Sequence, residues 1–177
     1  YDDIATGTFE ISVLRYPAQG GGKRLGSLIV NHGGPGASGV EYAYNAEYLF
    51  SPDITDVYDI VGFDPRGVSE SEPIACYTAK ETDENYASDS KPDNAAELAS
   101  TIESTKDFIA KCEDKTDHIT SYSTANAARD MDILRAALGD SKLNYMGKSY
   151  GTFMVTLYAQ LFPLSLIHIS EPTRLRR

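Results

Sequence analysis

Basic clusters and long apolar runs are both missing from this sequence. The 177 residues carry a formal net charge of −10, and no group of lysines and arginines stands out. Nucleic acid is therefore not an expected partner. No apolar run reaches the ~18 residues that a membrane-spanning helix needs, so no membrane span is predicted. A hydrophobic content of 41% is nevertheless enough for one globular domain with a core.

Cysteine and histidine are scarce as well. The two cysteines, Cys76 and Cys112, could be buried thiols in the cytosol or a single bridge in a secreted protein, and composition alone does not choose. The three histidines are His32, His118 and His168. No histidine or cysteine pair has the spacing of metal ligands, and no phosphate-binding loop occurs. We therefore expect neither a metal nor another cofactor.

Short apolar segments alternate with helical patterns along the chain. Strand-like runs occupy residues 8–14, 26–31, 56–64 and 143–146. Helical spacing begins at Asn94, again after Ser123 or Thr124, and again over residues 150–162, which are apolar nearly all round. Residues 77–93 are polar and acidic and predict an exposed loop. This order predicts an α/β fold, with its functional loops at the carboxyl ends of parallel strands.

The segment Gly147-Lys148-Ser149-Tyr150-Gly151 is a G-x-S-x-G motif between a strand-like run and a helix-like run. A serine on such a sharp turn is exposed for nucleophilic attack, and the two glycines let strand and helix approach each other. The N–H of Tyr150 would face a developing oxyanion at the start of the helix. The alternative is a glycine-rich turn with a capping serine.

The segment HGGPG, residues 32–36, follows the apolar run at 26–31. Adjacent glycines allow backbone N–H groups to turn inward, so this loop can supply the second oxyanion donor. We favour Gly34 as that donor, with Gly33 as the alternative. His32 is not expected to be the general base, because an imidazole within such a loop more often shapes it by hydrogen bonding.

Three segments together resemble a known family: HGGPGASG, GFDPRGVSESEPIAC, and the stretch from YSTANAARDMDILRAALG to NYMGKSYGTFMVTLYAQLFP. They are similar to α/β-hydrolase serine exopeptidases of the proline iminopeptidase and tripeptidyl aminopeptidase group. The resemblance implies that residues 1–163 are the N-terminal part of an α/β-hydrolase domain. Its mostly parallel sheet, with flanking helices, would be incomplete, and residues 76–121 would form an excursion with an acidic loop and a helix.

The resemblance also implies an activity and a location. The expected enzyme releases single residues or tripeptides from peptides with a free N-terminus, through an acyl-enzyme on Ser149. Tyr150 and Gly34, or Gly33, would form the oxyanion hole, and the DPRG turn would have no catalytic role. Relatives of the tripeptidyl type are commonly exported, which implies a secreted or envelope-associated protein and a Cys76–Cys112 bridge. An ester hydrolase and a non-catalytic binding protein on the same scaffold are the alternatives, and the sequence leaves the oligomeric state open.

The rest of the catalytic triad is not recognisable. The fold places the acid and then the histidine well downstream of the serine, but after Ser149 the only candidates are His168 and Glu171, in reversed order. Residues 164–177, LSLIHISEPTRLRR, resemble translated sequencing-adapter read-through and are expected to be a non-native tail; a divergent natural C-terminus is the alternative. The chain is therefore expected to be an inactive fragment of a hydrolase.

Overall fold

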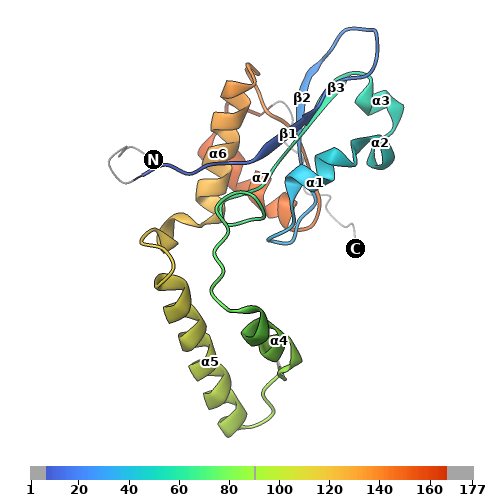
Figure 1. The fold of residues 1–177 in the computed structure, drawn as a ribbon. Helices are drawn as coiled ribbons and strands as arrows, with labels where there is room; N and C mark the ends of the chain where they lie inside the picture. Colours follow the sequence, from blue (N-terminus) through green and yellow to red (C-terminus); the bar gives the residue numbers. More distant parts are fainter. Residues whose placement is uncertain (1–6, 90, 167–177) are drawn as a thin grey trace, which may run out of the picture. The chain divides into compact units, whose positions relative to one another are not determined.

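The computed structural model describes residues 7–89 and 91–166. The chain divides into two compact units (Figure 1). The first unit is formed by residues 1–72 and 122–177, and the second by residues 73–121. The second unit therefore interrupts the first one in the sequence.

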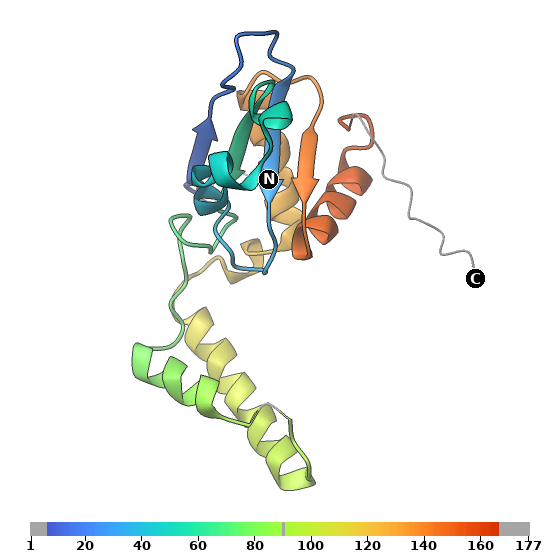
Figure 2. The same cartoon turned by 90° about the vertical axis from the view of Figure 1, so that its right-hand side faces the viewer.

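A four-stranded mixed sheet forms the centre of the first unit (Figure 2). Its strands, in chain order, are β1 (Val13–Tyr16), β2 (Gly26–Asn31), β3 (Tyr58–Phe63) and β4 (Asn144–Gly147). The spatial order is β1-β3-β2-β4, with β2 parallel to both β3 and β4, and β1 antiparallel to β3. The carboxyl ends of the three parallel strands therefore lie at one edge, as the expected mostly parallel sheet requires.

The strand expected over residues 8–14 is largely misplaced, because β1 begins only at Val13. Upstream of it, the Ser12 N–H donates to Ser71 Oγ at 2.9 Å, and the Ser12 carbonyl accepts from the Asp64 N–H at 3.0 Å. The alternation in 8–14 thus reflects a segment that hydrogen-bonds to a turn as well as to a strand. The other three strand predictions agree with β2, β3 and β4 to within about two residues at each end.

Helices cover both faces of the sheet (Figure 2). They are α1 (Gly39–Tyr44), α2 (Ala46–Leu49) and α3 (Pro52–Thr55) on one face, and α6 (Thr124–Ala137) and α7 (Tyr150–Leu161) on the other. The first three were not predicted, because their four to six residues are too short to show helical spacing. Ser123 caps α6 by accepting from the Asn126 N–H at 3.3 Å, as its position suggested.

Alternate residues of the central strands fill two separate cores. Ile29, Val61 and Phe63 pack towards Met131 of α6 and Met154 of α7, whereas their sequence neighbours pack under α1 and α2. A strand that is buried on both faces needs apolar side chains at nearly every position, which explains the apolar runs of β2 and β3. The nearly uniform apolar character of residues 150–162 is typical of a fully buried helix, but α7 is not buried all round, because Phe153 is 53% exposed.

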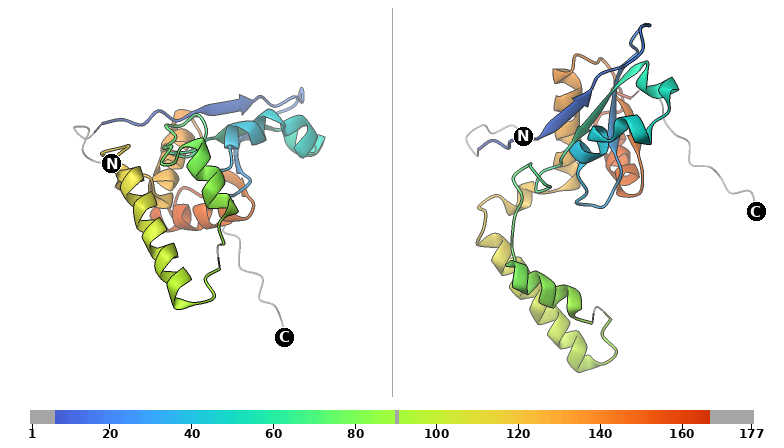
Figure 3. Two further views of the ribbon diagram at one scale, coloured as in Figure 1. Left: turned by 60° about the horizontal axis from the view of Figure 1, so that its bottom comes forward. Right: turned by 45° about the vertical axis from the view of Figure 1, so that its right-hand side comes forward.

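The second unit is a pair of helices that lie side by side (Figure 3). They are α4 (Ala79–Ala87) and α5 (Ala95–Glu113), and a short 3₁₀ turn, Ile119–Ser121, ends the unit. The prediction of a loop over 77–93 is therefore wrong, because Thr78 and Glu81 form a reciprocal capping box that starts α4 despite its polar composition. Asn94 caps α5, as its sequence position indicates.

The apolar residues that recur at helical spacing along α5 are only partly covered. Cys112 is buried, but Leu98, Ile102 and Ile109 are each about half exposed (47–50%). α5 contacts α4 through the Lys111–Glu81 ion pair at 2.7 Å, and it contacts the residues just before α4 through the rings of Tyr77 and Phe108, 4.9 Å apart. Throughout residues 7–89 and 91–166, no helix combines the length and the hydropathy of a membrane span.

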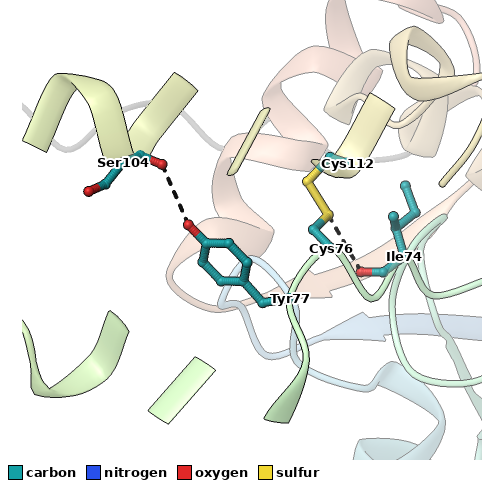
Figure 4. Close-up of a disulfide and its surroundings, with 5 residues drawn as sticks. All are labelled: Ile74, Cys76, Tyr77, Ser104 and Cys112. Atoms are coloured by element: carbon teal, nitrogen blue, oxygen red, sulfur yellow. Dashed lines mark hydrogen bonds between the residues drawn. A yellow bond between two sulfur atoms is a disulfide. The ribbon is translucent and has the colours of Figure 1, made fainter. Parts of the chain in front are cut away.

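A disulfide joins Cys76, just before α4, to Cys112, near the end of α5 (Figure 4). This is the pairing that the family resemblance implies. Beside it, the Tyr77 hydroxyl donates to the Ser104 carbonyl at 3.5 Å. The bridge links residues 36 positions apart within one unit that has little apolar core. Covalent closure is therefore a main constraint on how α4 meets α5.

Reduction of this disulfide is expected to destabilise the second unit selectively. Closing a loop of this length contributes about 4 kcal/mol through the unfolded state. After reduction, amides of α4 and α5 should exchange with deuterium faster, while those of β2 and β3 keep their protection. The C76S/C112S double variant is the matched control and should behave like the reduced protein. Two free thiols in the untreated protein, counted by mass shift after denaturing alkylation, would contradict the pairing.

Candidate active site

Ser149 lies on the turn between β4 and α7, with φ 50° and ψ −125°. Residues other than glycine rarely adopt a positive φ, so this backbone conformation persists only where the surrounding structure enforces it. The turn is closed by hydrogen bonds from the Gly151 N–H to the Lys148 carbonyl (2.8 Å) and from the Thr152 N–H to the Ser149 carbonyl (2.9 Å). The serine is exposed, and its side chain makes no capping bond to the helix. Its hydroxyl is thus presented outward.

The two glycines of the motif are required by close backbone approaches. A Cβ on Gly147 would lie 2.7 Å from the carbonyl carbon of Gly151, and a Cβ on Gly151 would lie 2.6 Å from the Asn31 carbonyl oxygen. Real Cβ atoms do not come this close to backbone. The Lys148 N–H also donates to the Asn31 carbonyl at 3.0 Å, which fixes the turn to the end of β2. The G-x-S-x-G pattern therefore has the geometric cause that its sequence context predicts.

Tyr145 connects the two limbs of this turn. Its hydroxyl donates to the Gly151 carbonyl at 3.0 Å, and its ring leaves no room for a side chain at Gly147. Burial, followed by the nearby Tyr150, raises the pKa of Tyr145 well above its usual range, so the phenol stays a hydrogen-bond donor. Sequence reasoning missed this residue because a tyrosine in a short strand looks like ordinary core.

The HGGPG loop lies directly against the serine. A Cβ on Gly33 would sit 2.9 Å from the Ser149 Cβ and 3.3 Å from its Oγ, and Gly33 and Gly34 both have positive φ values, 117° and 104°. The Gly33 N–H is already used, since it donates to Asn31 Oδ1 at 2.9 Å. Within the described chain, no acceptor bonds the N–H of Gly34 or of Tyr150. Both N–H groups therefore lack an acceptor among the described residues.

The His32 side chain packs against α1. Its ring stacks on Tyr42 of α1, with centroids 4.7 Å apart, and its Nδ1 is buried without a hydrogen-bond partner in the described structure. The histidine therefore contributes to how the loop meets α1. This arrangement agrees with its exclusion as the general base.

Asp64, at the end of β3, fixes the far side of the loop. Its fully buried carboxylate accepts from Ser38 Oγ (2.7 Å), the Val40 N–H (3.2 Å) and the Glu70 N–H (3.3 Å). Ser38 in turn caps α1. The carboxylate thus ties the start of α1 to the DPRG turn, which is a positioning role that the sequence pattern did not reveal. An aspartate directly after a buried strand is the signal that could have indicated it.

Arg66 of the same turn is anchored to α6. Its Nε and Nη2 donate to the two carboxylate oxygens of Asp130 at 2.6 and 2.8 Å, and only 10% and 9% of these side chains are exposed. The guanidinium also lies over the Phe9 ring, 4.3 Å from its centroid. A bidentate pair of this kind fixes orientation as well as distance. The DPRG turn is therefore held between α6 and the N-terminal segment.

The two residues considered for the rest of the triad, His168 and Glu171, lie outside the described residues. Residues 164–166 are described: the Ser165 carbonyl accepts from the Leu143 N–H at 2.6 Å, and Leu166 forms a parallel bridge with Leu143. In the part of the chain that the structure covers, no group of three or more histidine, cysteine or acidic side chains is placed to hold a metal ion.

A mostly parallel sheet with helices on both faces, and a strained serine at the turn into a helix, defines the scaffold of a nucleophile-elbow hydrolase. Residues 26–170 match the family model of the alpha/beta hydrolase fold, and the chain belongs to that family. The fold expected from the motifs is thereby confirmed.

The sequence is similar to three relatives of known name. It is 38% identical to serine protease Hip1 of Mycobacterium tuberculosis over 86% of this chain and 30% of that protein. It is 38% identical to a tripeptidyl aminopeptidase of Streptomyces lividans over 80% of this chain and 27% of the relative. It is 40% identical to carboxylesterase B of Mycobacterium tuberculosis over 77% of this chain and 27% of the relative. The chain thus spans less than a third of the length of each.

Proposed function

We propose that this chain supplies the nucleophile and the oxyanion hole of a serine peptidase that releases tripeptides or single residues from the free N-terminus of peptides. The observation that carries the proposal is the contact between Gly33 and Ser149, which sets the HGGPG loop against a serine with φ 50°. A non-catalytic binding protein has no need of that combination. Two of the relatives carry peptidase names, which supports the choice of substrate class.

The proposed reaction is acyl transfer through Ser149. Ser149 Oγ attacks the carbonyl carbon of the scissile C–N bond, and its proton passes to a histidine base. The N–H groups of Tyr150 and Gly34 bind the oxyanion, a stabilisation in which one donor is typically worth ~10²–10³ in turnover. The C–N bond then breaks, the amine leaves with the proton, and an ester remains on Ser149. Water hydrolyses that ester and regenerates the serine.

The base and the acid that orients it are expected in sequence that follows Pro163 in the natural gene. Without them the serine keeps an ordinary, weakly nucleophilic hydroxyl. We therefore propose that the 177-residue chain alone is inactive and that residues 164–177 are not native. We also propose a secreted or envelope location. The Cys76–Cys112 disulfide supports it, since such bridges persist mainly in oxidising compartments.

An esterase is the second candidate, because one relative that is 40% identical to this chain is named carboxylesterase B. The HGGPG loop and the DPRG turn favour the peptidase, since together they resemble the exopeptidase group. The two candidates differ in the bond that is cleaved, which makes them separable by substrate.

The test uses protein expressed from the source gene after re-sequencing past the codon for Pro163. We expect an acid and then a histidine in frame, labelling of Ser149 by a fluorophosphonate, and hydrolysis of a tripeptidyl anilide with a free N-terminus. The S149A variant should show neither labelling nor hydrolysis, and N-acetylation of the substrate should abolish its cleavage. Hydrolysis of short-chain acyl esters alone would favour the esterase. Full-length protein that folds but resists the fluorophosphonate would favour a binding protein and refute catalysis.

A further inference from the structure

A cavity of about 270 Å³ lies within the first unit, beside the oxyanion loop. Its walls come from three segments: the loop after β2, the DPRG turn after β3, and the start of α6. Gly33 and Tyr150 also line it, so the cavity shares residues with both sides of the candidate site. It is therefore next to the place where a substrate carbonyl would be held.

The lining is largely apolar. The groups that give it this character are Pro35, Ala37, Pro65, Val68, Tyr122 and Ala127. The lining residue with a charged side chain is Arg66, whose guanidinium is paired with the Asp130 carboxylate and covered by Phe9. Because this charge is neutralised within the protein, the cavity offers little to a charged ligand group.

The walls are also held in place. The Tyr150 hydroxyl is hydrogen-bonded to Thr124 Oγ1 at 2.7 Å, which ties the residue after the nucleophile to the start of α6. The Arg66–Asp130 pair ties the DPRG turn to the same helix. A cavity with fixed walls discriminates by size, since a larger group cannot enter without breaking these contacts.

The volume limits what can enter. Cavities that hold drug-sized ligands measure roughly 300–1,000 Å³, so this one is too small for a whole tripeptide. It has room for a single side chain beside the oxyanion hole. We infer that this cavity accepts one uncharged, apolar side chain of the peptide substrate, from a residue that flanks the scissile bond. The inference rests on the proposed function and adds the class of residue that is selected.

Two substitutions should change the selected size in opposite directions. Ala127 is 4% exposed and forms part of the wall on α6, so A127L narrows the cavity. Val68 lies on the opposite segment, so V68A widens it. One methylene in an apolar pocket changes kcat/KM by roughly 10–200-fold, which sets the scale of the expected effect. A136L is the matched control, because Ala136 is an exposed residue of the same helix outside the cavity.

The experiment measures kcat/KM of the full-length enzyme on two substrate series. One series varies the acyl-side residue of tripeptidyl anilides from alanine to leucine and phenylalanine; the other varies the leaving residue of tetrapeptides in the same way. In one series, A127L should lower the ratio of phenylalanine to alanine substrates at least tenfold, V68A should raise it, and A136L should leave it unchanged. The series that responds shows which side of the scissile bond the cavity serves.

The outcomes separate the two proposals. If neither ratio moves in V68A or A127L while Ser149 is still labelled by a fluorophosphonate, the cavity does not bind substrate and the proposed function stands. If the wild-type enzyme is not labelled, the proposed function itself fails. Should A127L not fold, the V68A ratios decide, since unchanged ratios in both series overturn the inference.

Discussion

Replacing Gly151 by alanine is expected to reduce kcat of the full-length enzyme by about a hundredfold or more. The added Cβ would lie 2.6 Å from the Asn31 carbonyl oxygen and 3.2 Å from the Tyr145 hydroxyl. The start of α7 must then move away from β2, and it carries both Ser149 and the Tyr150 N–H with it. A misplacement of about 1 Å in a catalytic group can cost 10²-fold. Steady-state kinetics and the rate of fluorophosphonate labelling would measure the effect.

G21A is the matched control for this prediction. Gly21 is exposed, and a Cβ there would meet nothing within 4 Å. Its activity should equal that of the wild type. A G151A enzyme with normal kcat would show that the elbow tolerates a shift of the helix, and the geometric argument for the motif would be wrong.

Breaking the Arg66–Asp130 pair is expected to have the largest effect on stability. Either D130A or R66A leaves a buried charge without its bidentate partner, which typically costs about 3–5 kcal/mol. Much of that cost is the penalty of the orphaned charge. Urea unfolding of the first unit, followed through tyrosine fluorescence, would measure the shift in midpoint.

The double variant R66M/D130L shows how much of the lost stability comes from the buried unpaired charge and how much from lost packing. Because it removes both charges and keeps apolar volume, it should recover most of the lost stability. Activity should recover less than stability, because the DPRG turn loses the two parallel hydrogen bonds from the Arg66 guanidinium to Asp130 that orient it beside the site. A single variant that unfolds like the wild type would contradict the argument that the pair anchors this turn.

The sequence predicts those parts of the fold in which one property of a residue, such as its hydrophobicity or its capping side chain, determines the local structure. The apolar runs of β2 and β3 predict strands buried on both faces, and Ser123 and Asn94 mark helix starts through capping chemistry. The elbow and the HGGPG loop were found for the same reason, because close backbone approach leaves glycine as the one usable residue.

The parts that sequence did not predict depend on contacts between distant residues. Alternation in residues 8–14 predicted a strand, but Ser12 bonds to Ser71 and Asp64 on a turn that lies some 50–60 positions away. The polar composition of residues 77–93 predicts a loop, but the capping box at Thr78 and ion pairs such as Lys111–Glu81 hold a helix there. In the site, Tyr145 and Asp64 act on neighbours that only the folded sheet brings close.

The close approach of Gly33 to Ser149 determines the stage of folding at which the two residues can meet. The two residues are more than a hundred positions apart, and they meet only when β4 has paired with β2 in parallel register. Pairings of such long range form late, because the entropy of closing the intervening chain must be overcome first. A chain in which β4 has not yet paired with β2 therefore has the serine of the turn but no HGGPG loop beside it. The serine and the HGGPG loop therefore come together only when the sheet is assembled, and a partly folded chain lacks this arrangement.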